Sequence, residues 1–142
     1  MRHWVGDMSI RDEIIKEART YLETPFHHQA RVKGVGIDCA GLIVAPLLHV
    51  GITVYDAPAY SRMPHGVLKP IIEKYCTKTT DPQPGDLYLF TYIHNQPQHL
   101  AWVTGKGMLH ACARSKKVVE HGFDERWQKR LVATYRINGV DE

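Results

Sequence analysis

The sequence predicts an α+β fold in a single domain, and two of its features carry this prediction. Apolar residues recur at helical spacing in the first half of the chain, whereas short alternating segments follow Pro84-Gly85-Asp86. Helices followed by a meander of antiparallel strands are typical of the α+β class. With 142 residues and no repeat, linker or low-complexity stretch, residues 1–142 are expected to form one domain.

Three helices are expected, over residues 10–22, 39–50 and 67–75. Ser9 is a suitable N-cap for the first helix and Asp38 for the second. The second helix is almost wholly apolar, which predicts that it is buried, and Pro46 inside it is expected to kink or shorten it. Residues 26–37 have no clear period and predict a loop, as do residues 60–63.

The second half of the chain predicts a sheet. Five strands are expected, over residues 87–92, 99–104, 108–113, 117–121 and 131–137, with a short helical turn over 124–129. Gly105-Lys106-Gly107 predicts a tight hairpin between the second and third of these strands.

Composition excludes several classes of protein. The net charge is only +3 and the basic residues are scattered, so no nucleic-acid partner is expected. No run approaches the roughly 20 apolar residues that span a bilayer, so no membrane insertion is expected. Three cysteines, an odd number, argue against a disulfide framework. The first 15 residues lack the apolar core of a signal peptide, which predicts cytoplasmic synthesis and delivery by other means.

Cys39 has the setting that a thiol nucleophile needs. It opens the predicted buried helix directly after Asp38. The positive end of the helix dipole is expected to lower the thiol pKa, and the unpaired amides of the first turn can hold an oxyanion. The small neighbours Ala40 and Gly41 are expected to leave room for a substrate.

A nucleophilic cysteine also needs a base and a residue that orients the base. His99 opens one predicted strand, and His110 lies in the strand after the hairpin turn. Closing the hairpin near residue 106 places the two histidines almost opposite each other on one sheet face, against which the Cys39 helix is expected to pack. The predicted roles are removal of the thiol proton by His99 and orientation of the His99 ring by His110.

Motifs in the right order resemble those of NlpC/P60 cysteine peptidases, and more narrowly the phage-tail and prophage cell-wall branch. The matching segments are Thr24-Pro25-Phe26-His27-His28-Gln29, Gly34-Val35-Gly36-Ile37-Asp38-Cys39-Ala40-Gly41-Leu42, Pro84-Gly85-Asp86-Leu87, His99-Leu100-Ala101-Trp102 and Met108-Leu109-His110-Ala111. The resemblance covers nearly the whole chain. It implies a papain-like fold with N-terminal helices packed on a C-terminal antiparallel sheet, no cofactor or metal, and cleavage of peptidoglycan stem peptides beside D-glutamate.

The resemblance also implies a set of substrate-binding residues, namely Asp38, Phe26, His28, Gln29 and Ala40. Many relatives have tyrosine at the position of Phe26 and serine at that of Ala40. Because phenylalanine has no hydroxyl, two alternatives are open: an oxyanion donor is missing, or His28 or Gln29 supplies it. The expected partners are the peptidoglycan stem peptide and other phage tail proteins, in a tail, virion or prophage-derived particle.

Three alternatives remain open from the sequence. One is a structural or assembly protein of a phage tail that keeps the fold with little activity. A second is an amidase or acyltransferase that uses the same residues on another acyl group. The third is a metal site built from the candidate residues and Cys112, which the absence of close ligand pairs disfavours. Cys76, Cys112, Trp102 and Trp127 are expected to be core residues.

Overall fold

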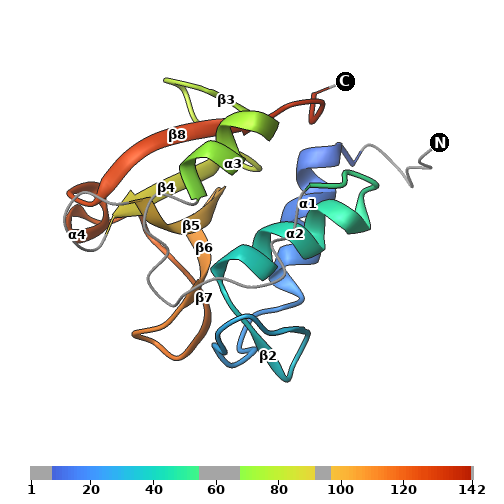
Figure 1. Ribbon diagram of the computed structural model, residues 1–142, viewed down its shortest axis with the longest axis vertical. Helices are drawn as coiled ribbons and strands as arrows, with labels where there is room; N and C mark the ends of the chain where they lie inside the picture. The colour runs from blue at the N-terminus through green and yellow to red at the C-terminus, as the bar shows by residue number, and fades with distance from the viewer. Residues whose placement is uncertain (1–7, 55–67, 92–96, 142) are drawn as a thin grey trace.

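The computed structural model describes residues 8–54, 68–91 and 97–141. The helices are α1 (Ile10–Arg19), α2 (Cys39–His49), α3 (Leu68–Tyr75) and α4 (Glu125–Gln128). The strands are β1 (Arg31–Val32), β2 (Gly36–Ile37), β3 (Cys76–Lys78), β4 (Leu87–Thr91), β5 (Pro97–Thr104), β6 (Gly107–Cys112), β7 (Lys117–His121) and β8 (Leu131–Ile137). Six of these strands form one antiparallel sheet in the order β3-β8-β4-β5-β6-β7. Helices α1 and α2 lie together beside the sheet (Figure 1), so the predicted α+β class and its arrangement are confirmed.

Several predicted boundaries were wrong for local reasons. Helix α1 ends at Arg19 rather than residue 22, because the Thr20 hydroxyl donates to the Glu17 carbonyl and Glu23 has a positive φ of 71°. The segment predicted as a loop forms β1 and β2, which pair across a turn at Gly34. Strand β3 was missed because three residues are too few to show alternation. The expected loop at residues 60–63, and the expected element ends at residues 67 and 92, lie outside the described residues.

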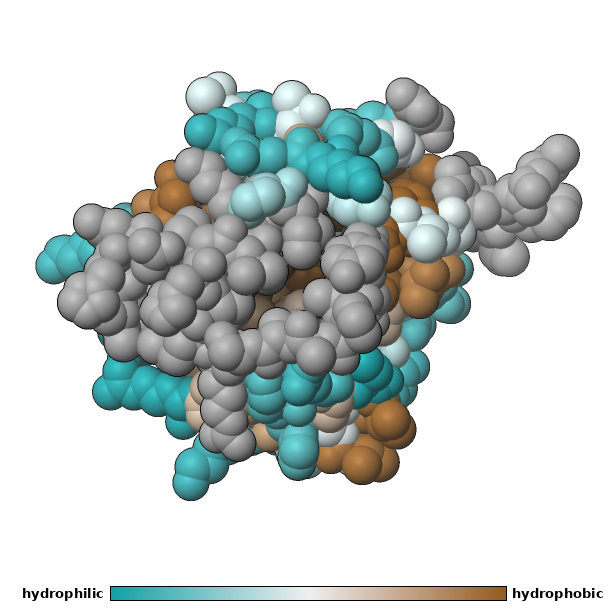
Figure 2. Space-filling model, in the orientation of Figure 1, coloured by the Kyte–Doolittle hydropathy of each residue, from teal (hydrophilic) through white to brown (hydrophobic). Residues whose placement is uncertain are grey.

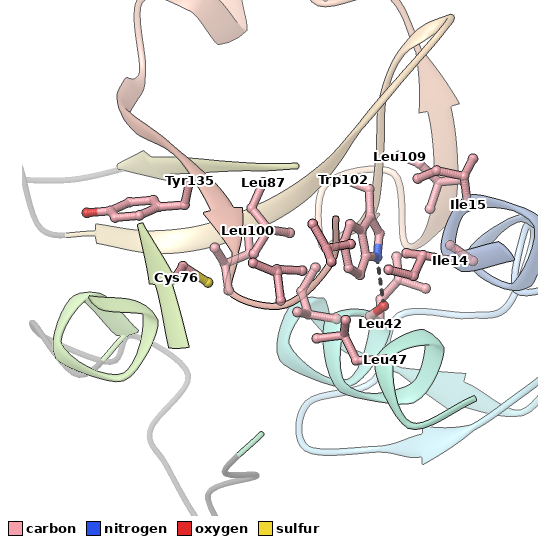
Figure 3. Packing of buried hydrophobic residues seen from close by; sticks show 14 of the residues in the cluster. Ile14, Ile15, Leu42, Leu47, Cys76, Leu87, Leu100, Trp102, Leu109 and Tyr135 are labelled. Atoms are coloured by element: carbon pink, nitrogen blue, oxygen red, sulfur yellow. Dashed lines mark hydrogen bonds between the residues drawn. The ribbon is translucent and has the colours of Figure 1, made fainter. Parts of the chain in front are cut away.

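Helix α2 continues through Pro46 to His49, so the expected shortening at the proline does not occur, while the alternative, a kink, stays a prediction. Proline has no N–H, so the Leu42 carbonyl four residues earlier loses its helical donor. The indole N–H of Trp102 in β5 donates to that carbonyl at 3.0 Å (Figure 3). Both residues are buried, at 0% and 1% exposure. The sheet thus supplies the hydrogen bond that proline removes, and this bond fixes α2 against β5.

Apolar residues form one cluster on each face of the sheet. The larger one joins α1 and α2 to the face bearing Leu100, Trp102 and Leu109, as Figure 3 shows in part. The smaller one covers the opposite face, where Ala101, Val103 and Met108 pack with Trp127 of α4. Trp102 and Trp127 are therefore core residues, as predicted.

Asp86, from the matched Pro84-Gly85-Asp86 segment, joins the sheet to α1. It is fully buried and forms ion pairs with Arg11 of α1 at 2.9 Å and Arg136 of β8 at 2.9 Å. Its carboxylate also accepts the Gln83 amide. A buried carboxylate requires such partners, because an unpaired charge in the interior is costly.

On the face in Figure 2, hydrophilic residues spread over the upper and lower parts, and apolar residues reach the surface in separate small areas. Among the described residues, no helix has both the length and the apolar character needed to cross a bilayer.

We predict that Trp102→Phe lowers the free energy of unfolding by about 1–3 kcal/mol, because the buried Leu42 carbonyl loses the indole N–H that donates to it. Urea denaturation measures this change. In a Pro46→Ala background the helix regains the missing N–H, so the same substitution should cost less. An equal cost in both backgrounds would contradict the assignment of this bond.

Candidate active site

The N-terminus of α2 is held by the carboxylate of Asp38. One carboxylate oxygen accepts the Gly41 amide at 3.0 Å and the Arg31 guanidinium at 2.7 Å, and the other accepts the Gln29 amide at 2.8 Å. Asp38 is 2% exposed. The predicted N-cap is confirmed, and the cap also ties the preceding loop to the helix.

The sequence analysis expected Gly41 to leave room for a substrate. In the structure Gly41 instead serves this cap, and the space beside it is filled. A Cβ at Gly41 would lie 2.9 Å from Cδ of Arg31 and 2.9 Å from Cγ1 of Ile37. Any side chain there would push Arg31 away from Asp38. Ala40, by contrast, is partly exposed.

Cys39 lies where strands β5 and β6 separate. Their paired residues end at Trp102 and Leu109. The Val103 amide donates toward β4, so by alternation the Leu100 amide points toward β6, beyond the last pair. That amide and the Ala40 amide hydrogen-bond the Cys39 sulfur. The thiol therefore occupies the gap at the end of the β5–β6 ladder, next to the residue that follows His99.

His99 and His110 are brought together, as the sequence predicted. His99 Nε2 and His110 Nδ1 are 2.7 Å apart, and the two residues are 3% and 0% exposed. The observed register, extended from its three pairs, sets His110 opposite Ala101, so the two histidines are diagonal neighbours rather than directly opposed. Their rings share the face with Trp127.

The expected packing of α2 on the histidine face was wrong. Strand alternation puts Leu100 and Trp102, which contact α2, on the other face from His99. Cys39 approaches the histidine strand through the gap beyond Trp102 instead.

His121 belongs to the same cluster and was missed by the sequence analysis. His110 Nε2 and His121 Nε2 are 2.8 Å apart, and His121 Nδ1 lies 2.8 Å from the Gly122 carbonyl oxygen. The three histidines sit on neighbouring strands at a constant spacing of 11 residues. That repeated spacing across two consecutive hairpins is the signal that could have revealed His121.

The pKa of the Cys39 thiol is shifted opposite to the expected direction. Cys39 as a residue is partly exposed, but burial of its thiol raises this pKa from 9.0 to about 11, and the negative charge of Asp38 acts the same way. The amides of Leu100 and Ala40 and the charge of Arg31 lower it, but by less. The helix-terminus effect predicted from sequence is present but is outweighed by desolvation.

The histidines are shifted toward the neutral form. Burial lowers the pKa of His99 from 6.5 to about 3 and that of His110 to about 2, the latter assisted by the neighbouring histidines. At neutral pH the thiol and both rings are therefore uncharged at rest.

The remaining candidates surround the cap. Phe26 is partly buried against the main core cluster, and its amide donates to the Lys116 carbonyl. His28 is partly exposed, and Gln29 is exposed with a positive φ of 62°. Substrate contacts for these residues, and for Asp38 and Ala40, stay predictions.

The three cysteines are all free, and both Cys76 and Cys112 are buried as expected of core residues. Within the described ranges, no three His, Cys, Asp or Glu side chains are grouped as metal ligands.

Solved structures share this fold. An NlpC/P60 family protein from Bacillus cereus ATCC 10987 matches with a TM-score of 0.67 and 21% identity, over 89% of this chain and 40% of that one. The NlpC/p60 domain of the peptidoglycan hydrolase SagA matches with a TM-score of 0.62 and 21% identity, over 89% and 98%. The P60 domain of an antigen from M. avium subspecies paratuberculosis matches with a TM-score of 0.63 and 19% identity, over 94% and 96%. The fold is therefore that of NlpC/P60 domains.

The sequence itself gives the family. The profile of the NlpC/P60 family matches residues 23–136, which is well over half of the chain. The chain therefore belongs to the NlpC/P60 family. It spans 40% of the length of the Bacillus cereus protein and 43% of a Staphylococcus aureus relative of similar fold. Among curated proteins, none matches the sequence.

The raised thiol pKa leads to a prediction for alkylation. Because the thiolate forms only as the pH approaches about 11, Cys39 should react slowly with iodoacetamide at pH 7, and faster as pH rises from 8 to 10. Mass spectrometry of the Cys39 peptide measures the rate, with Cys39→Ala as the control for the other two thiols. A midpoint below the ordinary value of 9.0 would contradict the dominance of burial.

The lowered histidine pKa values predict acid sensitivity. Below pH 6.5 the unfolded state binds protons that native His99 and His110 do not, so stability should fall as pH drops from 6.5 to 5. The slope approaches about 1.4 kcal/mol per pH unit for each histidine. Denaturation at several pH values measures it, and His110→Gln should reduce it. A stability independent of pH in this range would refute the prediction.

Proposed function

We propose that this protein is a cysteine peptidase that hydrolyses peptide bonds in peptidoglycan stem peptides, with Cys39 as nucleophile, His99 as base and His110 as the residue orienting the base. The observation that carries the proposal is the position of the Cys39 thiol, at the N-terminus of α2 and hydrogen-bonded to the amide that follows His99. The family and the similarity to a peptidoglycan hydrolase domain support the substrate class.

The resting pair is neutral, which sets the order of events. His99 removes the thiol proton as the sulfur attacks the scissile carbonyl, rather than in a preceding equilibrium. The amides beside the sulfur, of Ala40 and Leu100, are the nearest donors for the charge that develops. The protonated base then gives its proton to the leaving amine, and water hydrolyses the thioester.

Phe26 fits this mechanism as a packing residue. Its ring is partly buried against the core and has no hydroxyl. The oxyanion donors are therefore backbone amides, those of Ala40 at the α2 terminus and Leu100 in β5, with His28 or Gln29 as the side chains that can add to them.

The proposed setting is a phage tail or prophage-derived particle, with other tail proteins as partners. This finer assignment rests on the sequence resemblance alone. A tail-assembly role with little activity is the second candidate, and the burial that keeps the Cys39 thiol protonated favours it.

Cys39→Ala should abolish release of peptide fragments from purified peptidoglycan, and His99→Ala should lower it by about 10²-fold or more, since general-base catalysis contributes that much. Mass spectrometry of the released fragments measures both. Cys76→Ala, which removes a core thiol in β3, is the matched control and should retain cleavage. Cleavage that survives in folded Cys39→Ala would refute the peptidase assignment, and no cleavage by the wild type would favour the assembly role.

A further inference from the structure

His121 and the Gly122 carbonyl fix the hydrogen positions in the whole histidine cluster. A carbonyl oxygen only accepts, so His121 Nδ1, 2.8 Å away, carries a proton. In a neutral ring the other nitrogen is then an acceptor. His121 Nε2 therefore accepts from His110 Nε2, which lies 2.8 Å away.

The same rule determines which nitrogen of His99 carries the proton. With its proton on Nε2, neutral His110 has an acceptor at Nδ1 and receives the proton of His99 Nε2 over 2.7 Å. Neutral His99 is thereby left with an unprotonated Nδ1. Because Nε2 of His99 faces His110, this is the tautomer that the proposed base role requires. It is set by the Gly122 carbonyl, which His121 contacts at the far end of the cluster.

The carbonyl is itself held in place. Its oxygen also accepts the Asp124 amide at 2.9 Å. Gly107, with φ of 134°, allows the close approach of this segment, since a Cβ there would lie 2.6 Å from Gly122 Cα and 2.6 Å from the Phe123 amide nitrogen. Trp127 covers the three rings, with its ring centre 5.6, 4.9 and 6.2 Å from those of His99, His110 and His121.

We propose that His121 is a positioning residue that ends a three-histidine relay, which sets the tautomer of His99 and carries to the surface the positive charge formed when Cys39 is deprotonated. The proposal rests on the proposed function for its chemical role. His99 and His110 are buried, whereas His121 is partly exposed and lines a pocket of about 330 Å³. The charged groups that line this pocket with it are Arg114, Asp124, Arg126 and Arg130.

The relay step is balanced without any further reagent. The S–H bond of Cys39 breaks and an N–H bond forms at His99 Nδ1. The proton on His99 Nε2 passes to His110 Nδ1, and the proton on His110 Nε2 passes to His121 Nε2. As the S–H bond breaks, the sulfur forms its bond to the scissile carbonyl carbon. The products are therefore the anionic tetrahedral adduct and a His121 imidazolium, with His99 and His110 again neutral but in the opposite tautomer.

Two variants separate this relay from a merely structural role. Glu at position 121 can only accept from His110 when ionised, whereas Lys can only donate. H121E should therefore keep the proton of His99 on Nε2, and H121K should move it to Nδ1. Thermal denaturation of both variants checks that each is folded.

The experiment is ¹⁵N NMR of the imidazole nitrogens, which needs no substrate. In the wild type at neutral pH we expect protons on His99 Nε2, His110 Nε2 and His121 Nδ1. On acidification, one titration step should make His121 doubly protonated while His99 and His110 stay neutral and exchange tautomers. A His99 proton on Nδ1 at neutral pH, a His99 ring that becomes doubly protonated before His121, or the same His99 tautomer in H121E and H121K would each overturn the relay.

Peptidoglycan cleavage adds the functional readout. We expect H121E to stay within about tenfold of the wild type and H121K to lose about 10²- to 10⁴-fold in kcat, as the loss of a general base does. Equal activities in the two variants would overturn the relay while leaving the peptidase assignment intact. Conversely, a wild type without Cys39-dependent cleavage would refute the proposed function, and the NMR result would still decide the relay.

Discussion

The placement of Cys39 depends on how α2 is fixed against β5. A proline inside a buried helix leaves a carbonyl without a donor, and here Trp102 supplies the donor from the sheet. An apolar helix can slide or rotate on an apolar face with little change in buried area, because the hydrophobic effect has no direction. A single buried hydrogen bond between fixed atoms removes that freedom. Because of Pro46, the Leu42 carbonyl is satisfied only when α2 lies at one position along β5, the strand that bears His99.

The same helix terminus poses an electrostatic conflict. The Asp38 carboxylate pairs with Arg31 and caps the helix, yet its charge opposes formation of a thiolate on the next residue. Arg31 and the two amides at the sulfur offset only part of this effect. The site is therefore built to stabilise negative charge poorly at rest. In the proposed peptidase mechanism the negative charge passes from the sulfur to a substrate oxygen, so a free thiolate beside Asp38 is not required.

Much of the fold and part of the site could be predicted from the sequence. The cap at Asp38, the core role of Trp127 and the His99–His110 contact all follow from local pattern, because each depends on neighbouring residues or on one hairpin. The predictions that were wrong concerned properties that depend on distant parts of the chain. The face on which α2 packs and the direction of the Cys39 pKa shift follow from how elements assemble and how deeply they are buried. The short strands β1 and β3 were missed for a different reason, because two or three residues are too few to show the alternation of polar and apolar residues that predicts a strand.

Histidine rather than a carboxylate suits the position of His110. That position is fully buried under Trp127, where an ionised side chain would be costly without a compensating partner. An imidazole avoids this cost because it orients a neighbouring ring while uncharged, but it does so in either of two polarities. The direction of the hydrogen bonds of a neutral His110 is therefore set by the residue on its other side. The series of hydrogen bonds must end at a group that can only accept. The Gly122 carbonyl is such a group, so in the proposed relay a buried and uncharged histidine cluster holds His99 in one tautomer.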